Sequence, residues 1–179
     1  MPRLFTGLEI PPDLGFALSL KRGGLTGARW IDPENYHITL RFIGDVDGPL
    51  ADDIAASLDR LTNSLRFPIK LTHLGVFGGD KPRALYAGVE PSEELARLQA
   101  AHERMVQKAG IAPEGRKFVP HVTLARLRSG AAADVARFIA DAGRFEPLSF
   151  VPARFVLYSS RDSVGGGPYV VEQTYPMAA

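Results

Sequence analysis

His37-Ile38-Thr39-Leu40 and His121-Val122-Thr123-Leu124 are two copies of one pattern, His-x-Thr-Leu, in distant parts of the chain. The chain has only four histidines among its 179 residues. The probability that two of them carry this pattern by chance is roughly one in ten thousand. An aromatic residue lies just before each copy, and an arginine follows soon after it. We interpret the repetition as an internal duplication, with one copy in each half of a two-lobed molecule.

Side-chain alternation along a β-strand decides what the two copies present. Both lie in segments, residues 36–43 and 118–127, whose composition and patterning predict strands. Successive side chains of a strand point to opposite faces of the sheet, so each histidine shares a face with the threonine two residues later. The intervening apolar residues face a core. If two sheets carry one copy each and face one another, two histidines and two threonines meet across a cleft.

This set of side chains suits the hydrolysis of a phosphodiester. A neutral imidazole can take a proton from an attacking water, and an imidazolium can protonate the departing sugar oxygen, because histidine titrates near pH 6.5. Each positioned proton transfer accelerates a reaction by roughly 10²–10⁴-fold. The hydroxyls of Thr39 and Thr123 can bind the nonbridging oxygens, where negative charge collects. We therefore predict His37 and His121 as the catalytic pair. No carboxylate adjoins either histidine in the motif, so we expect no metal ion and no other cofactor.

The other two histidines and the two nearby arginines lie outside the repeated pattern. His73 lies in an apolar strand and His102 on a helix face, so we expect both to be structural. Strict alternation places Arg41 on the His37 face. It places Arg126 on the face opposite to His121, unless a bulge re-aims the side chain. The residues alone leave the choice of a phosphate ligand open, and each arginine has the alternative of being a solvated charge at a sheet edge.

Aromatic and glycine-rich features allow a functional and a structural interpretation, and we prefer the structural one. Trp30, Phe42 and Phe77 are candidates for stacking on a nucleobase, but core packing is the default for each. Gly165-Gly166-Gly167 follows no strand–helix pattern suited to a dinucleotide, which favours a simple loop.

The rest of the chain mixes helical and extended segments. Hydrophobic periodicity predicts helices over residues 12–21, 49–61, 92–109 and 131–142. Further strands are predicted over residues 3–10, 67–77, 84–89, 148–159 and 169–175. Hairpins alternate with helices in this order, which favours an α+β fold with mainly antiparallel sheets. No low-complexity segment or serine-rich linker interrupts the order, so we place no domain boundary within residues 1–179.

Composition narrows the class of protein. Hydrophobic residues make up 45% of the chain and charged residues 23%, which is enough apolar material for a sizeable core. The net charge of +1 is low for a protein that coats RNA, but an enzyme that grips one end of a strand needs only a local positive patch. The lack of cysteine excludes disulfides and thiolate nucleophiles and agrees with a cytoplasmic location. The N-terminal residues do not resemble a signal peptide, and no apolar run approaches about 18 residues, so we expect no membrane partner.

The paired motifs resemble those of the two-histidine (2H) phosphoesterase superfamily. Within it, the chain is similar to the bacterial and archaeal RNA 2′,3′-cyclic phosphodiesterases, also called 2′-5′ RNA ligases. The similarity extends over almost the whole length and is carried by residues 3–14 (RLFTGLEIPPDL), 34–46 (ENYHITLRFIGDV), 74–90 (LGVFGGDKPRALYAGVE), 117–127 (KFVPHVTLARL) and 155–160 (FVLYSS). The paired motif indicates the superfamily, and the flanking segments indicate the RNA-end family within it.

The resemblance implies a bilobal, pseudo-twofold fold in which two mainly antiparallel sheets face a central cleft, with helices on the outside. It implies hydrolysis of a terminal 2′,3′-cyclic phosphate to a 2′-phosphate, and the reverse joining of ends through a 2′-5′ linkage. It assigns His37 as the proton donor to the leaving 3′-oxygen and His121 as the base that activates water. Thr39 and Thr123 would bind phosphate, assisted by Arg126 in the family's H-x-T-L-x-R position. The residues alone do not distinguish the acid from the base.

The expected partner is RNA that ends in a 2′,3′-cyclic phosphate, with tRNA fragments among the candidates, and we expect a monomer. Three alternatives stay open. They are a related phosphodiesterase acting on 2′-5′ oligonucleotides or small cyclic nucleotides, a non-catalytic module that binds RNA ends, and a metal-dependent hydrolase. Comparing turnover of the different substrates tests for the related phosphodiesterase. A lack of turnover at high enzyme concentration would indicate the binding module, and inhibition by EDTA would indicate the metal-dependent hydrolase.

Overall fold

The computed structural model describes residues 1–128, 132–160 and 167–179. Its strands are β1 (Arg3–Glu9), β2 (Ala28–Trp30), β3 (His37–Asp45), β4 (Ile69–Phe77), β5 (Ala84–Val89), β6 (His121–Leu127), β7 (Leu148–Phe150), β8 (Arg154–Ser159) and β9 (Val170–Pro176). Its helices are α1 (Pro12–Ser19), α2 (Gly48–Leu58), α3 (Glu93–Lys108) and α4 (Ala132–Asp141), with short 3-10 turns η1 (Pro33–Asn35) and η2 (Asp59–Leu61).

The strands form two antiparallel groups that meet at one residue pair. The strand order is β7-β4-β5-β6-β3-β1-β8-β9, with β2 beside β6. We call β7, β4, β5, β6 and β2 the β6 half, and β3, β1, β8 and β9 the β3 half. Ile38 pairs with Val122, and this is the single residue pair that joins β3 to β6. The prediction of an α+β fold with mainly antiparallel sheets is confirmed, with the addition that this pair makes the two sheets continuous.

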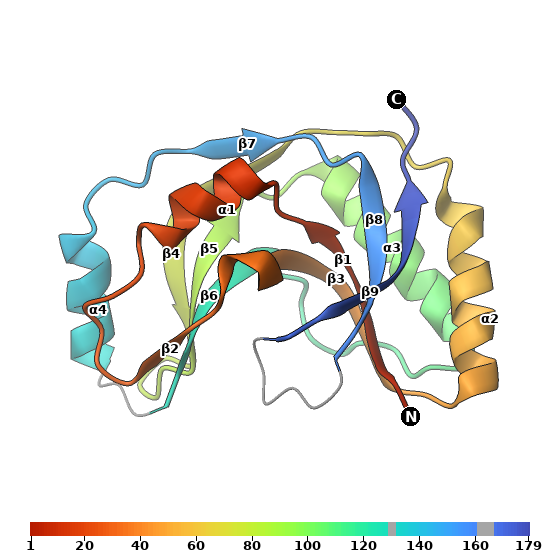
Figure 1. The fold of residues 1–179 in the computed structure, drawn as a ribbon, viewed down its shortest axis with the longest axis horizontal. Coiled ribbons are helices and arrows are strands. Elements are labelled where there is room, and N and C mark those ends of the chain that lie inside the picture. Colours follow the sequence, from red (N-terminus) through yellow and green to blue (C-terminus); the bar gives the residue numbers. More distant parts are fainter. Residues whose placement is uncertain (129–131, 161–166) are drawn as a thin grey trace.

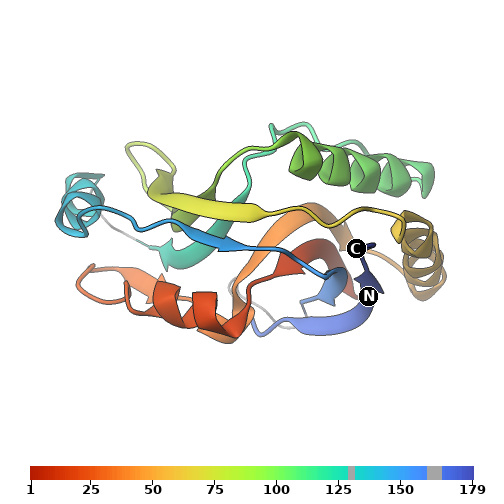
Figure 2. The same ribbon diagram turned by 90° about the horizontal axis from the view of Figure 1, so that it is seen from above.

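The helices lie around the outside of the strands. Figure 1 shows α4 at the end of the β6 half and α2 and α3 at the opposite end, beside the β3 half. Seen from above in Figure 2, α1 and α3 lie on opposite sides of the strands. Helix α3 begins where the sequence predicts, because the Ser92 side chain accepts a hydrogen bond from the Leu95 amide at 3.1 Å and so caps the first turn. Within the described residues no helix is long and apolar enough to cross a bilayer.

Two predicted elements end differently in the structure. The strand predicted over residues 148–159 is divided into β7 and β8, because Pro152 has no amide hydrogen to donate to a neighbouring strand. The helix predicted over residues 49–61 is α2 followed by the short turn η2. Ala131, at the start of another predicted helix, lies outside the described residues, as do Gly165 and Gly166 of the glycine-rich loop.

The apolar residues that alternate with the polar ones in each motif lie in the core. Ile38, Leu40, Val122 and Leu124 are all at most 3% exposed and belong to one large apolar cluster, which also takes in residues of α2 and α3. Burying a side chain of this size stabilises the folded state by roughly 1.5–3 kcal/mol. The predicted inward direction of these four residues is therefore confirmed.

His102 is a fully buried residue of α3. Its Nδ1 lies 2.9 Å from the Thr6 hydroxyl of β1, and its Nε2 has no hydrogen-bond partner among the described residues. Burial lowers the pKa of the His102 imidazole to about 3. The ring packs edge-on against Phe155, with ring centres 4.7 Å apart. These contacts agree with the structural role expected from the sequence.

His102 should make the protein sensitive to acid. Because the folded state holds the imidazole neutral, its contribution to stability is complete above pH 6.5 and is lost as the pH falls from 6.5 toward 3, by about 1.4 kcal/mol per pH unit. In the His102→Gln variant, the free energy of unfolding should therefore fall by about 2 kcal/mol less than in wild type between pH 6.5 and pH 5. Urea unfolding at the two pH values measures this difference. Equal acid sensitivity in His102→Gln and wild type would refute the explanation.

Candidate active site

The pairing of Ile38 with Val122 brings the two motifs together. Because the strands are antiparallel, this register sets His37 across from Thr123, and Thr39 across from His121, on the face opposite to the buried pair. All four polar residues line one cavity of about 620 Å³. Each histidine is the first residue of its strand. The structure thus assembles in one place the four residues predicted from the repeated pattern.

Both strands contain a bulge at the same position of the motif. In β3, Thr39 and Arg41 pair with consecutive residues of β1, which leaves Leu40 as the extra residue. In β6, Thr123 and Ala125 pair with consecutive residues of β5, which leaves Leu124 as the extra residue. A bulge shifts the alternation by one residue. Consequently, the residue five positions after each histidine returns to the cavity side.

This shift places Arg126 and Arg41 on different faces of the sheet. Arg126 occupies the shifted position in β6, is exposed and lines the cavity. Phe42 occupies the equivalent position in β3. The bulge that could re-aim Arg126 is present. The expectation that Arg41 shares the His37 face through strict alternation is wrong, because the bulge at Leu40 precedes it.

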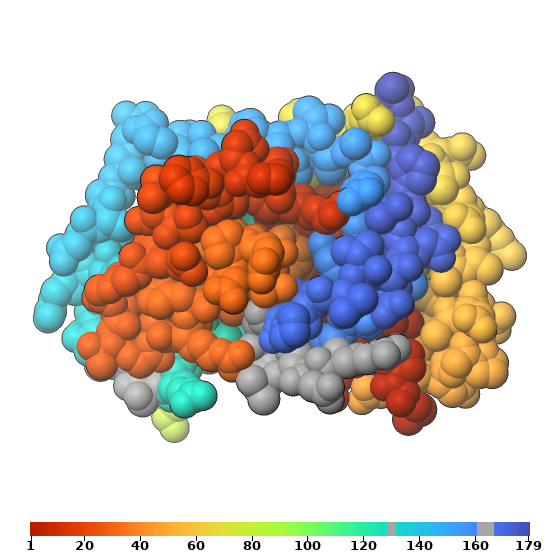
Figure 3. Space-filling model, in the orientation of Figure 1, coloured from red at the N-terminus to blue at the C-terminus, as the bar shows by residue number. Residues whose placement is uncertain are grey.

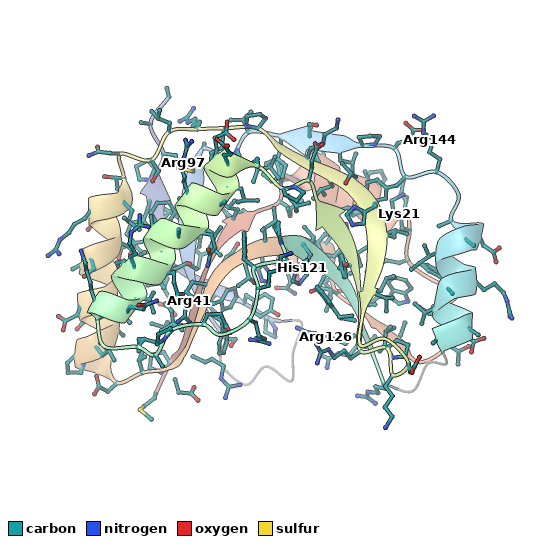
Figure 4. The ribbon with its side chains drawn as sticks, turned by 180° about the vertical axis from the view of Figure 1, so that it is seen from behind. Lys21, Arg41, Arg97, His121, Arg126 and Arg144 are labelled. Carbon is teal, nitrogen blue, oxygen red and sulfur yellow. The ribbon has the colours of Figure 1, made fainter. Side chains whose placement is uncertain are left out.

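Arg41 is instead a structural residue at the edge of the cavity. It is only 5% exposed, and its guanidinium forms an ion pair with Glu103 of α3. It also donates to the backbone carbonyls of Phe42 and Ala112, the latter at 2.6 Å. Figure 4 shows Arg41 beside α3, whereas Arg126 extends from β6. The charge of Arg41 is therefore already satisfied within the protein.

The two imidazoles are oriented by the same backbone contact. His37 Nδ1 lies 2.9 Å from the Asn35 carbonyl oxygen, and His121 Nδ1 lies 2.7 Å from the Val119 carbonyl oxygen. A carbonyl oxygen only accepts, so Nδ1 carries the hydrogen in both rings. In the neutral ring, Nε2 is then the nitrogen with a free lone pair. The Thr39 hydroxyl lies 3.0 Å from His37 Nε2 and can donate to it.

Aromatic rings surround each histidine. The His37 ring centre lies 5.0 Å from that of Phe5, 5.4 Å from that of Tyr158 and 5.0 Å from that of Tyr169. The sequence motif alone did not indicate these neighbours, because they lie in segments far from His37 in the sequence. The Asn35 side chain accepts a hydrogen bond from the Tyr169 amide at 3.3 Å. Figure 3 shows the orange segment around η1 close to the blue segment that leads into β9.

The second histidine has a corresponding aromatic wall. The His121 ring centre lies 4.8 Å from that of Phe77 and 5.3 Å from that of Tyr86. These rings restrict both the orientation of the imidazole and its access to water. Phe77 and Phe42 also line the cavity, and Phe42 is 45% exposed. Trp30 packs on the core and against Phe138, so its expected structural role agrees with its contacts.

His73 lies on β4 outside the cavity lining. Its side chain is exposed, and its Nδ1 lies 3.0 Å from the hydroxyl of Thr72. The ring covers Gly88 of β5, where an added Cβ would lie 2.1 Å from a ring atom. A side chain at position 88 would therefore require the exposed His73 ring to move. These contacts favour the structural role predicted for His73.

Burial sets the protonation state of the candidate catalytic pair. Desolvation lowers the pKa of His37 to about 4, and the positive fields of His121 and Arg126 act in the same direction. The hydrogen bond to the Asn35 carbonyl partly opposes this shift. The pKa of His121 is also lowered, first by desolvation and then by Arg126. Both rings are therefore neutral at pH 7 until a negative charge enters the cavity.

The cavity is strongly cationic. In the part of the chain that the structure describes, six basic residues line it, and the carboxylate among the lining residues is Glu114. The basic residues are Arg3, Arg41, Arg83, Arg116, Lys117 and Arg126. Among the described residues, no group of three or more His, Cys, Asp or Glu side chains is placed to hold a metal ion. The electrostatics of the cavity suit an anion.

Comparison with known proteins agrees with this arrangement. Residues 29–163 match the 2′-5′ RNA ligase superfamily. The chain belongs to this superfamily. It is 31% identical over 162 residues to an RNA 2′,3′-cyclic phosphodiesterase of Bacillus subtilis, and the match covers 88% of this chain and 87% of that one. It is 43% identical over 100 residues to the RNA 2′,3′-cyclic phosphodiesterase of Aeropyrum pernix, where the match covers 55% of this chain and 56% of the relative, little more than half its length.

The fold is also that of solved members of the superfamily. The structure of E. coli LigT in complex with 3′-AMP superposes with a TM-score of 0.77 and 21% sequence identity, and the superposition covers 100% of both chains. At this level of identity the likeness concerns the fold.

The low pKa of His37 can be measured directly. In a proton NMR titration of the free protein, His37 should titrate near pH 4, and His121 below pH 6.5. Arg126→Ala should raise the pKa of both histidines, because it removes a positive charge that disfavours the imidazolium. Saturating inorganic phosphate should also raise both values. A His37 pKa near 6.5 that ignores Arg126→Ala would contradict the electrostatic description.

Proposed function

We propose that this chain is an RNA 2′,3′-cyclic phosphodiesterase that converts a terminal cyclic phosphate to a 2′-phosphate by acid–base catalysis. The observation that carries the proposal is the meeting of both His-x-Thr motifs at one cationic cavity, through the Ile38–Val122 pair. The names of the relatives in Bacillus subtilis and Aeropyrum pernix support the same activity. The same groups also allow the reverse reaction, in which ends are joined through a 2′-5′ linkage.

In the hydrolytic direction, the two histidines act on the same phosphorus centre, one as the base and the other as the acid. His121 accepts a proton at Nε2 from the water whose oxygen attacks phosphorus. His37 gives the proton on its Nε2 to the 3′-oxygen as the bond from this oxygen to phosphorus breaks. Each positioned proton transfer contributes roughly 10²–10⁴ to the rate. The resemblance to the family assigns these roles, and the nearly equivalent surroundings of the rings are consistent with proton transfer in either direction.

The negative charge of the substrate promotes protonation of the proposed acid, His37. In the free protein both imidazoles are neutral at pH 7, because burial and Arg126 lower their pKa values. The negative charge of a bound cyclic phosphate raises these pKa values and stabilises a proton on His37. The Thr39 and Thr123 hydroxyls and the Arg126 guanidinium bind the nonbridging oxygens, whose negative charge increases in the transition state. Catalytic protonation is thus coupled to substrate binding.

The pseudo-twofold arrangement becomes asymmetric at the bulge. The β6 half contributes Arg126, a cation, to the phosphate, whereas the β3 half contributes Phe42 at the equivalent position. Phe42 is 45% exposed at the cavity, which suits stacking on the base of the terminal nucleotide. This difference gives the substrate one preferred orientation between two similar motifs.

We also propose that residues 1–179 act as a single bilobal catalytic unit. Each half supplies one histidine and one threonine, so neither half contains a complete set of catalytic groups. Because one copy of the chain supplies the whole set, a monomer suffices for activity. RNA with cyclic phosphate ends, including tRNA fragments, and a cytoplasmic location remain our proposals for the substrate and the compartment.

The direct test is incubation with a short RNA that ends in a 2′,3′-cyclic phosphate. The expected product is the 2′-monophosphate, identified by its phosphorus NMR shift, and EDTA should leave the rate unchanged. A linear 2′-5′ oligonucleotide serves as the comparison substrate and should react much more slowly. Absence of product at high enzyme concentration would favour a binding module, loss of activity in EDTA would favour a metal-dependent hydrolase, and faster cleavage of the linear oligonucleotide would favour the related phosphodiesterase.

A further inference from the structure

The cavity contains more positive charge than a cyclic phosphate requires. Three of its basic residues are neutralised within the protein: Arg3 pairs with Asp45, Arg41 with Glu103, and Arg116 with Glu114. Arg83, Lys117 and Arg126 form no ion pair or side-chain hydrogen bond with other described residues. A cyclic phosphodiester carries one negative charge, which Arg126 alone balances. Within the described residues, the positive charges of Arg83 and Lys117 are thus left without a negative counterpart.

The two surplus cations lie in segments that adjoin β6. Arg83 immediately precedes β5, and its carbonyl oxygen accepts a hydrogen bond from the Leu127 amide at 2.9 Å, next to Arg126 on β6. Lys117 lies in the segment that leads into His121. Both side chains are exposed and line the cavity. They therefore flank the two ends of the motif in the β6 half.

Among the residues that the structure describes, the β3 half offers no comparable free charge to a nucleic acid. Its cavity cations, Arg3 and Arg41, are the ones that carry ion pairs, and its position equivalent to Arg126 is Phe42. The free cations next to β6 and the exposed ring of Phe42 on β3 bind different parts of a nucleic acid. The cations suit a phosphodiester backbone, and the ring suits a base.

We propose that Arg83 and Lys117 form a subsite for the phosphodiester backbone immediately upstream of the cyclic end, so that the RNA chain leaves the cavity along β6. The inference rests on the proposed function, since it extends the same site to the preceding nucleotides. Each upstream phosphodiester supplies the negative charge that a cyclic mononucleotide lacks. The enzyme therefore prefers the end of an RNA chain to a cyclic mononucleotide, and this preference resides in two residues outside the His-x-Thr motifs.

The test compares adenosine 2′,3′-cyclic phosphate with a short RNA that ends in the same cyclic nucleotide. Arg83→Ala and Lys117→Ala should each raise the KM for the RNA about tenfold, the effect of losing one charged hydrogen bond. The kcat for the RNA and both constants for the cyclic mononucleotide should stay near their wild-type values. Arg83→Lys and Lys117→Arg, which keep the charge, should retain most of the preference. Lys81→Ala is the matched control, because Lys81 is exposed in the same loop as Arg83 but does not line the cavity.

Salt dependence provides a readout that a purely structural role would not change. For single-stranded RNA, each phosphate contact contributes about 0.7 to the slope of log affinity against log salt concentration. Each alanine variant should therefore reduce this slope by about 0.7 in equilibrium binding of an RNA that ends in a 2′-phosphate. An unchanged slope, an unchanged KM, or an equal loss with the cyclic mononucleotide would overturn the subsite. If wild type hydrolyses neither substrate but the variants still weaken RNA binding, the proposed activity fails and the subsite stands.

Discussion

The antiparallel pairing of Ile38 with Val122 is the contact on which the rest of this molecule depends. Both side chains are completely buried, and the pair is the single connection between β3 and β6. Because the residues on either side of a paired position face the opposite way, burying these two side chains directs two histidines and two threonines into one cavity. The same interaction thus stabilises the core and assembles the site. A polar residue at either position would leave a buried polar group at the joint of the two halves, at a cost of about 1–3 kcal/mol.

The second constraint is electrostatic. The imidazoles are held by backbone carbonyls and enclosed by aromatic rings, and burial lowers their pKa values in the free protein. The positive charge of the cavity lowers these pKa values further. The proposed acid, His37, is therefore neutral while the cavity holds no anion. A bound phosphate reverses the local field. The folded protein therefore bears no permanently buried imidazolium, and in the proposed mechanism the substrate itself stabilises the proton on His37.

Period-two alternation was sufficient to predict which motif residues face the core and which face the cavity. It also predicted the strands that carry them and the antiparallel character of the fold. It failed one residue later, because the bulges at Leu40 and Leu124 leave no mark in the sequence. Arg41 was consequently placed on the wrong face, and its ion pair with Glu103 depends on how α3 packs on β3, which no local pattern determines. The aromatic neighbours of His37 lie far from it in the sequence, so no local pattern predicts them either. The division of the cavity cations into paired and unpaired residues likewise required the folded chain.

The central claim is that His37 and His121 act as one unit on a single phosphorus atom. The most direct measurement is kcat/KM for an RNA 2′,3′-cyclic phosphate in His37→Ala, His121→Ala and the double variant, with His73→Ala as the control. Each single variant should lose roughly 10²–10⁴ of the rate, and the double variant should lose little more than either one. His73→Ala should retain wild-type activity. Losses that simply multiply in the double variant, or single variants that remain nearly as active as wild type, would contradict the account.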